Sequence, residues 1–274
     1  MIVGIDWGNS SVKVCGPNGI DKFPSAIGEY WERNLESTHG RDDMVFEYNG
    51  RKGFAGTLAI ESDFGSSIMG STKNHEDALL RVLLALHRYE YAGSYRIVVG
   101  QPIDTHNEKE KEEIKRMVVG SHWIRVNGEE KRIVIDECQV AAEGVASFWS
   151  APVDGLVRII DLGSATCNCG SLLDKRYLNK DSFTLHFGME TINTTDIGEI
   201  TRGIYASTSK RWKRDDCVLI VGGAAERLLE PIMSYYPNAS LIQPTVSHSG
   251  KLETAKPIFA TAVGFYRIGE RIYG

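Results

Sequence analysis

Residues 4–13 read Gly4-Ile5-Asp6-Trp7-Gly8-Asn9-Ser10-Ser11-Val12-Lys13, and residues 160–166 repeat their pattern as Ile160-Asp161-Leu162-Gly163-Ser164-Ala165-Thr166. In each stretch an apolar run ends in an aspartate, and small or hydroxyl residues lead into a second alternating run. This pattern predicts a strand, a tight turn and another strand. Glycine and small side chains let backbone N–H groups approach an anion, and a carboxylate at a strand end can hold a hydrated divalent cation. The two turns together predict one pocket built from two half-sites.

The bulk composition indicates an ordinary globular protein. The chain has 274 residues, of which 42% are hydrophobic and 24% charged, enough for one large domain or two closely joined domains. The net charge of −5 argues against direct, nonspecific binding to nucleic acid. The five cysteines are odd in number and lie in apolar or strand-like runs, which favours buried reduced thiols.

The apolar runs also bear on location. None is long enough to cross a bilayer, and the strand pattern begins at the N-terminus without room for a signal peptide. We therefore expect a cytoplasmic protein with no membrane partner.

The order of predicted elements repeats along the chain. The first half predicts strands at about 1–7, 11–16 and 19–23, a helix at 75–91, a strand at 95–99, a charged helix at 108–117, a hairpin turning at Asn127-Gly128 and a helix at 139–149. The second half predicts strands at about 156–161 and 166–173, a possible third at 176–177, helical segments between 189 and 207, a strand at 217–221, a helix at 224–235, a strand at 240–242 and a helix at 256–273.

This duplication predicts an α/β fold of two lobes, each with a central sheet covered by helices and each presenting its acidic turn to a shared cleft. The first lobe comprises residues 1–150 and 256–274, and the second comprises residues 151–255. A turn-rich segment at about 24–73 is expected to form a small subdomain inserted into the first lobe. The second lobe has no room for a matching insertion.

These motifs resemble those of the actin, Hsp70 and sugar-kinase superfamily of nucleotide-binding proteins, which has a duplicated actin-like (ribonuclease H-like) fold. The family's two phosphate loops match residues 6–13 and 161–166, its adenosine loop matches 218–226, and its two interlobe helices match 139–147 and 261–271. The segment Ile97-Val98-Val99-Gly100-Gln101-Pro102-Ile103, followed by a charged helix, resembles the plasmid-segregation branch of the bacterial actins. The lack of an inserted subdomain in the second lobe resembles short members of that branch.

The resemblance implies roles for particular residues. Asp6 and Asp161 would hold Mg²⁺ from opposite lobes, and Lys13 would reach the phosphates. The phosphate cradle would comprise Gly8, Asn9, Ser10, Ser11, Gly163, Ser164 and Ala165. The nucleoside would be held by Glu199, Arg202, Gly222, Gly223 and Ala224.

The resemblance also implies which groups take part in hydrolysis. Gln139, opening an interlobe helix, would position the attacking water, with Asp161 as the second catalytic residue. The alternative is that Glu137 or Glu143 positions the water, or that no side chain does.

The function implied by the resemblance is that of a filament-forming protein that binds and hydrolyses ATP or GTP with Mg²⁺. It would assemble with itself head to tail and segregate plasmid DNA through a DNA-binding adaptor on the plasmid centromere, without contacting nucleic acid directly. Two alternatives stay open. The same turns resemble those of type III pantothenate kinases, which are small-molecule kinases of similar size, and a nucleotide-binding scaffold with low turnover would also fit.

Overall fold

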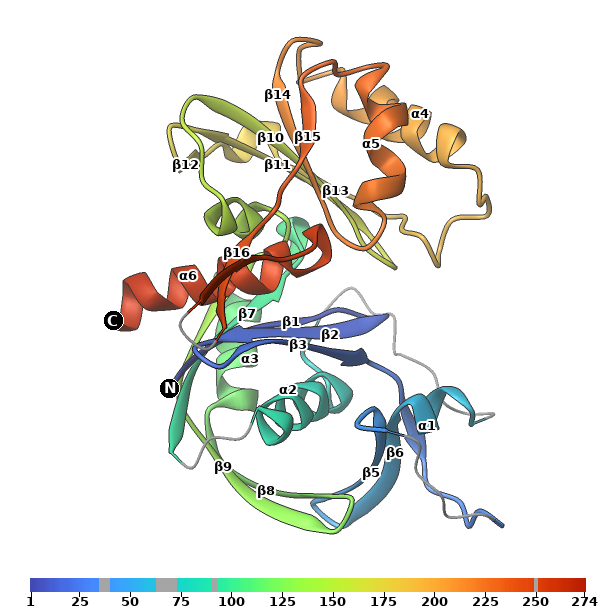
Figure 1. Cartoon of the computed structure of the whole chain (residues 1–274), viewed down its shortest axis with the longest axis vertical. Coiled ribbons are helices and arrows are strands. Elements are labelled where there is room, and N and C mark those ends of the chain that lie inside the picture. Colours follow the sequence, from blue (N-terminus) through green and yellow to red (C-terminus); the bar gives the residue numbers. More distant parts are fainter. Residues whose placement is uncertain (35–39, 63–72, 90–92, 249–250) are drawn as a thin grey trace.

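The computed structural model describes residues 1–34, 40–62, 73–89, 93–248 and 251–274. These residues form two large sheets with a helix between them (Figure 1), and a separate two-stranded sheet. The first sheet has nine strands in the order β3-β2-β1-β7-β9-β8-β5-β6-β4. Its strands are β1 (Ile2–Trp7), β2 (Ser11–Gly16), β3 (Gly19–Pro24), β4 (Ile27–Glu29), β5 (Asp43–Tyr48), β6 (Arg51–Gly56), β7 (Ser94–Gln101), β8 (Gly120–Val126) and β9 (Glu129–Ala142).

Helix α2 (Glu76–Arg88) fills the inside of the curved first sheet (Figure 1). His75 caps its N-terminus by accepting a hydrogen bond from the Ala78 N–H, which satisfies one of the unpaired donors of the first turn. Most of the helix is buried because it packs in the main apolar core with β1, β7 and β9. Helix α3 (Glu108–Val118) is amphipathic and buries Ile114 and Val118, and α1 (Thr57–Ile60) is a single turn.

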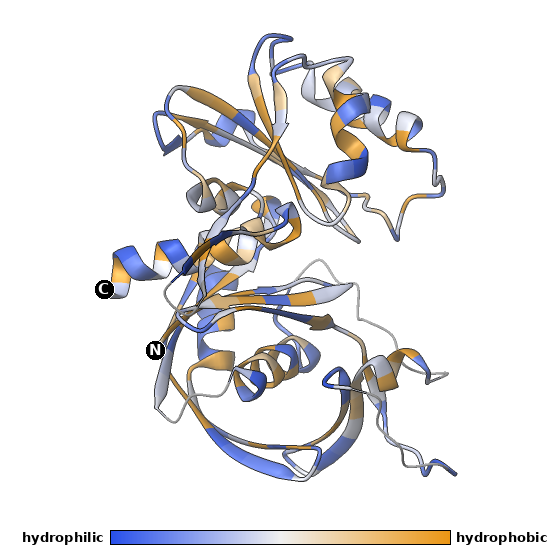
Figure 2. Cartoon of the chain, viewed as in Figure 1, coloured by the Kyte–Doolittle hydropathy of each residue, from blue (hydrophilic) through white to orange (hydrophobic). Residues whose placement is uncertain are grey.

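The second sheet has the order β12-β11-β10-β14-β15, with β13 paired to β11. Its elements are β10 (Leu156–Leu162), β11 (Cys167–Leu173), β12 (Arg176–Tyr177), β13 (Phe183–Leu185), α4 (Ile197–Thr208), β14 (Cys217–Val221), α5 (Ala225–Met233) and β15 (Ala239–Leu241). Figure 2 shows apolar residues concentrated in β10 and β14 and along one side of α5. Leu228 and Ile232 bury that side of α5, whereas Glu226 and Glu230 are exposed.

The two sheets share one local plan. In each, a central strand pairs antiparallel with the strand after its acidic turn and parallel with a strand from later in the chain: β1 with β2 and β7, and β10 with β11 and β14. Each acidic turn follows the same end of its central strand. The two turns therefore occupy equivalent positions in the two sheets, as the repeated sequence pattern predicts.

Helix α6 (Ala260–Tyr273) lies between the sheets and packs on β1, β2 and β7 (Figure 1). It also crosses the 3₁₀ helix η2 (Val145–Ser150). A hairpin of β16 (Thr245–His248) and β17 (Lys251–Thr254) and the short 3₁₀ helix η4 (Pro257–Phe259) lead into α6. No helix among the described residues is long and apolar enough to span a membrane.

One predicted helix is wrong. Residues 139–142 continue β9, in register with β7 through the pairs Val98 with Gln139 and Gln101 with Ala142, and a helical element begins only with η2. The local sequence is alanine-rich, but parallel pairing with β7 outweighs that weak helical preference. Gly144 then takes a φ of +76°, which an α-helix does not allow.

Other expectations need smaller corrections. The helical region between residues 189 and 207 is limited to α4 and an irregular approach to it, and the β16–β17 hairpin and β13 were not predicted. The segment at 24–73 contains β4, β5, β6 and α1, and β5 pairs with β8, so that these strands extend the first sheet. Residues 35–39 and 63–72 of that segment, and 90–91 of the predicted helix, lie outside the described residues. The lobe boundaries stay a prediction.

Candidate functional site

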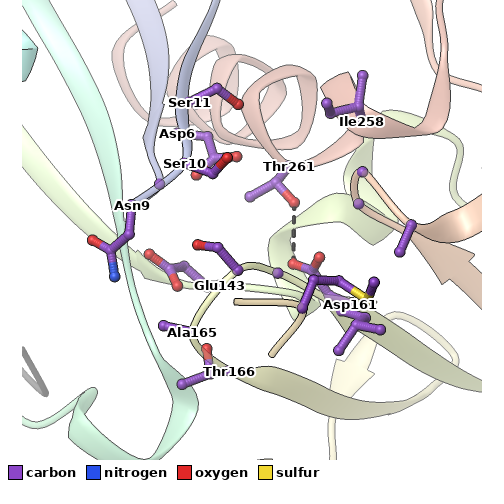
Figure 3. A pocket seen from close by; sticks show the side chains of 18 of the residues that line it. Asp6, Asn9, Ser10, Ser11, Glu143, Asp161, Ala165, Thr166, Ile258 and Thr261 are labelled. Carbon is purple, nitrogen blue, oxygen red and sulfur yellow. Dashed lines mark hydrogen bonds between the residues drawn. The ribbon is translucent and has the colours of Figure 1, made fainter. Parts of the chain in front are cut away.

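A cavity of about 300 Å³ lies between the two acidic turns. Figure 3 shows Asp6, Asp161 and Glu143 approaching it from different elements. Residues of both sheets and of the segment before α6 line it: Asp6, Gly8, Asn9, Ser10, Ser11, Lys13, Lys73, Glu143, Asp161, Leu162, Gly163, Ser164, Ala165, Thr166, Asn168, Met189, Glu190, Gly222, Gly223, Ala224, Arg227, Ile258 and Thr261. The volume is at the lower end of the range for small-molecule sites.

The first half-site is the β1–β2 turn. Asp6 and Lys13 are opposite each other in the antiparallel pair, and Lys13 Nζ lies 3.1 Å from Asp6 Oδ2. Gly8 lies close to Ser11 and Lys13, since a Cβ on Gly8 would lie 3.0 Å from Ser11 O and 3.2 Å from Lys13 Nζ. The turn therefore presents backbone N–H groups and the Lys13 ammonium to an anion, and the Asp6 carboxylate to a metal cation bound with that anion.

The second half-site is the β10–β11 turn. It is closed by a hydrogen bond from Gly163 N to Thr166 O at 2.9 Å. Gly222, in the turn after β14, lies against Asp161, since a Cβ on Gly222 would lie 2.8 Å from Asp161 Oδ1. Its φ of +93° is in the region that favours glycine. A side chain at this position would both be strained and displace the carboxylate.

The carboxylates of the cavity influence each other's charge. Burial, followed by the negative charges of Asp6 and Glu143, raises the pKa of Asp161 to about 7, and a hydrogen bond donated by Thr261 Oγ1 at 3.5 Å acts in the opposite direction. Burial also raises the pKa of Glu143, against the attraction of Lys73. A cation between these groups would relieve their repulsion.

Glu143 is the carboxylate that the sequence left as an alternative. Its N–H donates to Gln101 O at 2.8 Å, and its Oε1 is buried without a hydrogen-bond partner among the described residues. Gly100 makes room for it, since a Cβ on Gly100 would lie 2.6 Å from Glu143 Cγ. Gln139, the preferred candidate, lies in β9 and is not among the residues that line the cavity. The expected position of Gln139 at the start of a helix is wrong.

Lys73 is a functional candidate that the sequence analysis missed. Its side chain is buried, and Nζ donates to Asn9 Oδ1 at 3.2 Å and to Trp7 O at 3.4 Å. Burial lowers the pKa of Lys73, and the charge of Glu143 opposes that shift. No motif surrounds Lys73 in the sequence, so only the folded chain reveals its position.

The residues predicted to hold the nucleoside fall into two groups. Gly222, Gly223 and Ala224 line the cavity as expected, with Ile258 and Arg227 beside them. Glu199 and Arg202 are exposed residues of α4 and do not line it. Glu199 accepts a hydrogen bond from Thr194 Oγ1 at 2.7 Å, which accounts for it as part of the helix start.

The carboxylates of the cavity can hold a metal ion that needs few protein ligands. The described residues contain no group of three or more His, Cys, Asp or Glu side chains arranged to hold a metal. Mg²⁺ needs fewer protein ligands, since it keeps several waters and accepts phosphate oxygens. Asp6 and Asp161 fit that role because they face one cavity from two sheets and because the proximity of Asp6 disfavours ionisation of Asp161.

Comparison with protein families and curated sequences gives one match. The family model described as "Actin like proteins N terminal domain" matches residues 4–145. No curated protein matches the chain.

Solved structures match over the whole chain. A structure described as "AlfA Filament bound to AMPPNP" is 21% identical, with a TM-score of 0.77 over 100% of this chain and 99% of that chain. The filament of AlfA from the B. subtilis plasmid pLS32 is 20% identical, with a TM-score of 0.77 and the same coverage. A 15-stranded ParM filament from Clostridium botulinum is 18% identical, with a TM-score of 0.79 over 99% of each chain. At these identities the likeness shows a shared fold.

Proposed function

The chain belongs to the actin-like proteins, and from this premise we propose that it is a filament-forming protein that binds and hydrolyses ATP or GTP with Mg²⁺. We further propose that it segregates plasmid DNA through a DNA-bound adaptor. The actin-like α/β fold expected from the sequence is confirmed.

The observation that carries the proposal is the convergence of Asp6 and Asp161 on one cavity, each in a glycine-bearing turn at the end of a central strand. Phosphoryl transfer needs neutralised charge around the phosphates, an oriented nucleophile and little covalent help from the protein. Mg²⁺ held by the two carboxylates would supply that neutralisation. The backbone of the turns would cradle phosphate oxygens, at Gly8, Asn9, Ser10, Ser11, Gly163, Ser164 and Ala165.

Glu143 is the residue that we propose orients the attacking water. Its carboxylate faces the cavity from β9's end, and its buried Oε1 has no partner among the described residues. A carboxylate in this position accepts a hydrogen bond from water and can take its proton as the phosphate is attacked. Gln139 does not line the cavity, so we do not assign it this role.

The nucleoside end of the ligand is proposed to lie at Gly222, Gly223 and Ala224. The turn follows β14 directly and exposes backbone to the cavity. Gly222 permits close approach because it has no Cβ and holds a positive φ.

Assembly into filaments is supported by the likeness to AlfA and ParM structures that are themselves filaments. A filament requires a head-to-tail interface that does not close on itself. The net charge of −5 supports attachment to DNA through an adaptor rather than directly.

Light scattering and sedimentation test the proposal. Purified chain is mixed with ATP or GTP in Mg²⁺ or in EDTA, and phosphate release is followed in parallel. Polymer and phosphate release that need both nucleotide and Mg²⁺ are expected. Asp161→Ala should abolish phosphate release while circular dichroism shows an intact fold. Phosphate transfer to a small metabolite without any polymer would favour the kinase alternative instead.

A further inference from the structure

Lys73 is a buried cation that lines the cavity and has no carboxylate within salt-bridge distance among the described residues. Its side chain is 6% exposed, and it forms no salt bridge within the described parts of the chain. Both of its acceptors, Asn9 Oδ1 and Trp7 O, are neutral oxygens. Burying an ammonium without a direct ion pair is costly. Glu143 attracts Lys73 without forming a salt bridge with it, so this arrangement favours a further anion in the cavity.

Among the described residues, the hydrogen bonds of Lys73 leave one of its N–H donors without an acceptor. A lysine ammonium has three N–H donors. Two of them serve Asn9 Oδ1 and Trp7 O, and the side chain lines the cavity. The third donor is therefore available to a group bound in the cavity. Lys13, the other lysine of the lining, lies 3.1 Å from Asp6 and is already paired.

Asn9 holds Lys73 in place together with Arg81. Arg81 is fully buried in α2, and its Nη1 donates to the same Asn9 Oδ1 at 3.2 Å while its Nε donates to Ser25 O at 3.0 Å. Figure 3 shows the Asn9 amide turned away from Asp161. The Asn9 side chain therefore serves to position two cations behind the turn, while its backbone carbonyl accepts a hydrogen bond from Ser25 Oγ.

The surroundings of Lys73 indicate which part of a nucleotide it meets. Its neighbours come from the β1–β2 turn and α2, and the charge of Glu143 acts on it more strongly than that of Asp6. Glu143 is the group assigned to the attacking water. A phosphate bound beside both Lys73 and Glu143 would therefore be the one that water attacks.

Resting on the nucleotide function proposed above, we propose that Lys73 binds the terminal phosphate of a nucleoside triphosphate and makes the site prefer a triphosphate over a diphosphate. The remaining N–H donates to a terminal phosphate oxygen, and the buried positive charge gains its counterion. A diphosphate has no terminal phosphate at this position, so it provides neither an acceptor for this N–H nor a negative charge beside the Lys73 ammonium. Lys73 is thus a specificity-determining residue, and Arg81 acts on it through Asn9 as a positioning residue.

The test compares two ligands with Mg²⁺ by isothermal titration calorimetry: ADP and AMPPNP, whose imido bridge resists hydrolysis. The guanine pair replaces them if the hydrolysis assay selects GTP. Lys73→Met keeps the length of the side chain and removes its charge and donors. We expect AMPPNP affinity to fall about 10- to 100-fold, the effect of losing a charged hydrogen bond, while ADP affinity changes less than about threefold.

Two variants control for folding and for unspecific charge loss. Lys175→Met removes an exposed lysine on the second sheet, 48% exposed and outside the cavity lining, and should leave the ratio of the two affinities unchanged. If Lys73→Met fails to fold, Lys73→Gln carries the test, since its amide can still donate to Asn9 and Trp7 without the charge. The measurement is accompanied by thermal unfolding of each variant.

The outcomes separate this inference from the proposed function. Wild-type protein that binds neither ligand would overturn the nucleotide function and the role of Lys73 with it. Wild-type binding combined with equal losses for AMPPNP and ADP, or with no loss for either, would leave the nucleotide function standing and overturn the role of Lys73. A loss confined to AMPPNP supports both.

Discussion

Gly264 of α6 lies directly against the carbonyl of Ala146 in η2. A Cβ on Gly264 would overlap Ala146 O and approach Ser147 Cα to 3.1 Å. The two segments therefore cross with backbone in contact, and they do so between the sheets that carry the two half-sites (Figure 1).

The first prediction concerns Gly264→Ala. The added methyl group must push α6 and η2 apart, because the atoms it meets are backbone and cannot rotate away. We expect the free energy of unfolding to fall by about 3 kcal/mol, measured by urea denaturation.

Gly203→Ala is the matched control. Gly203 lies in α4 with nothing within 4 Å of a Cβ, so alanine should raise the free energy of unfolding by about 0.5–1 kcal/mol through its higher helix propensity. Equal effects of the two substitutions would show that the crossing is not close-packed.

A second prediction concerns a buried ion pair in the second sheet. Arg158 Nε donates to Asp216 Oδ2 at 2.7 Å, and its Nη1 lies 3.2 Å from Asp181 Oδ2. Arg158→Met leaves the buried Asp216 carboxylate without its partner, which should lower the free energy of unfolding by about 3–5 kcal/mol. Removing the exposed partner of Asp154 by Lys175→Met should change it by less than about 0.5 kcal/mol. If Arg158→Met and Lys175→Met lowered the thermal unfolding temperature equally, the result would argue against a buried ion pair at Arg158.

The half-sites were predictable because their signal is local. Asp6 and Asp161 each end an apolar run and precede a glycine-bearing turn, and the strand periodicity places both at strand ends. Repetition of the pattern then implied two equivalent turns. The residues predicted from the two turns line the cavity, because each turn is specified by its own short stretch of sequence and not by contacts with distant segments.

The parts that were missed depend on contacts between distant segments. Residues 139–142 have helical preferences, but β7, some 40 residues earlier, recruits them into a parallel pair. That pairing keeps Gln139 in β9 and out of the cavity lining, and the group that lines the cavity is the carboxylate of Glu143. Lys73 was missed for the same reason, since its partners Trp7 and Asn9 lie more than 60 residues away.

A third prediction separates Glu143 from Gln139. Glu143→Gln keeps the size of the side chain and removes the group that accepts the proton of water, so the rate of phosphate release should fall by about 10²- to 10⁴-fold. Nucleotide affinity should change little, because the metal and phosphate contacts remain. Gln139→Ala, outside the cavity lining, should retain nearly the wild-type rate. A larger loss in Gln139→Ala than in Glu143→Gln would reverse the assignment.

The last prediction is the pH dependence caused by Asp161. In protein free of metal and nucleotide, the pKa of Asp161 is raised from 3.8 to about 7, mainly by burial and then by the charges of Asp6 and Glu143. Between these values the folded state keeps the proton that the unfolded state has lost, so the free energy of unfolding falls as pH rises through this window. Above pH 7 the full cost of the ionised carboxylate is present. Asp161→Asn removes it and should be more stable than wild type by about 2 kcal/mol at pH 8, allowing for partial exposure to solvent.

That advantage should shrink as pH falls and become small near pH 4, because wild-type Asp161 is then neutral in the folded state and only about half ionised in the unfolded state. Urea denaturation in EDTA at several pH values between 4 and 8 measures the difference between the two proteins. Asp215→Asn, which replaces an exposed carboxylate, serves as the control and should show no such trend. An Asp161→Asn effect that is independent of pH would mean that Asp161 ionises normally, and the repulsion assigned to the metal-free cavity would then have to be abandoned.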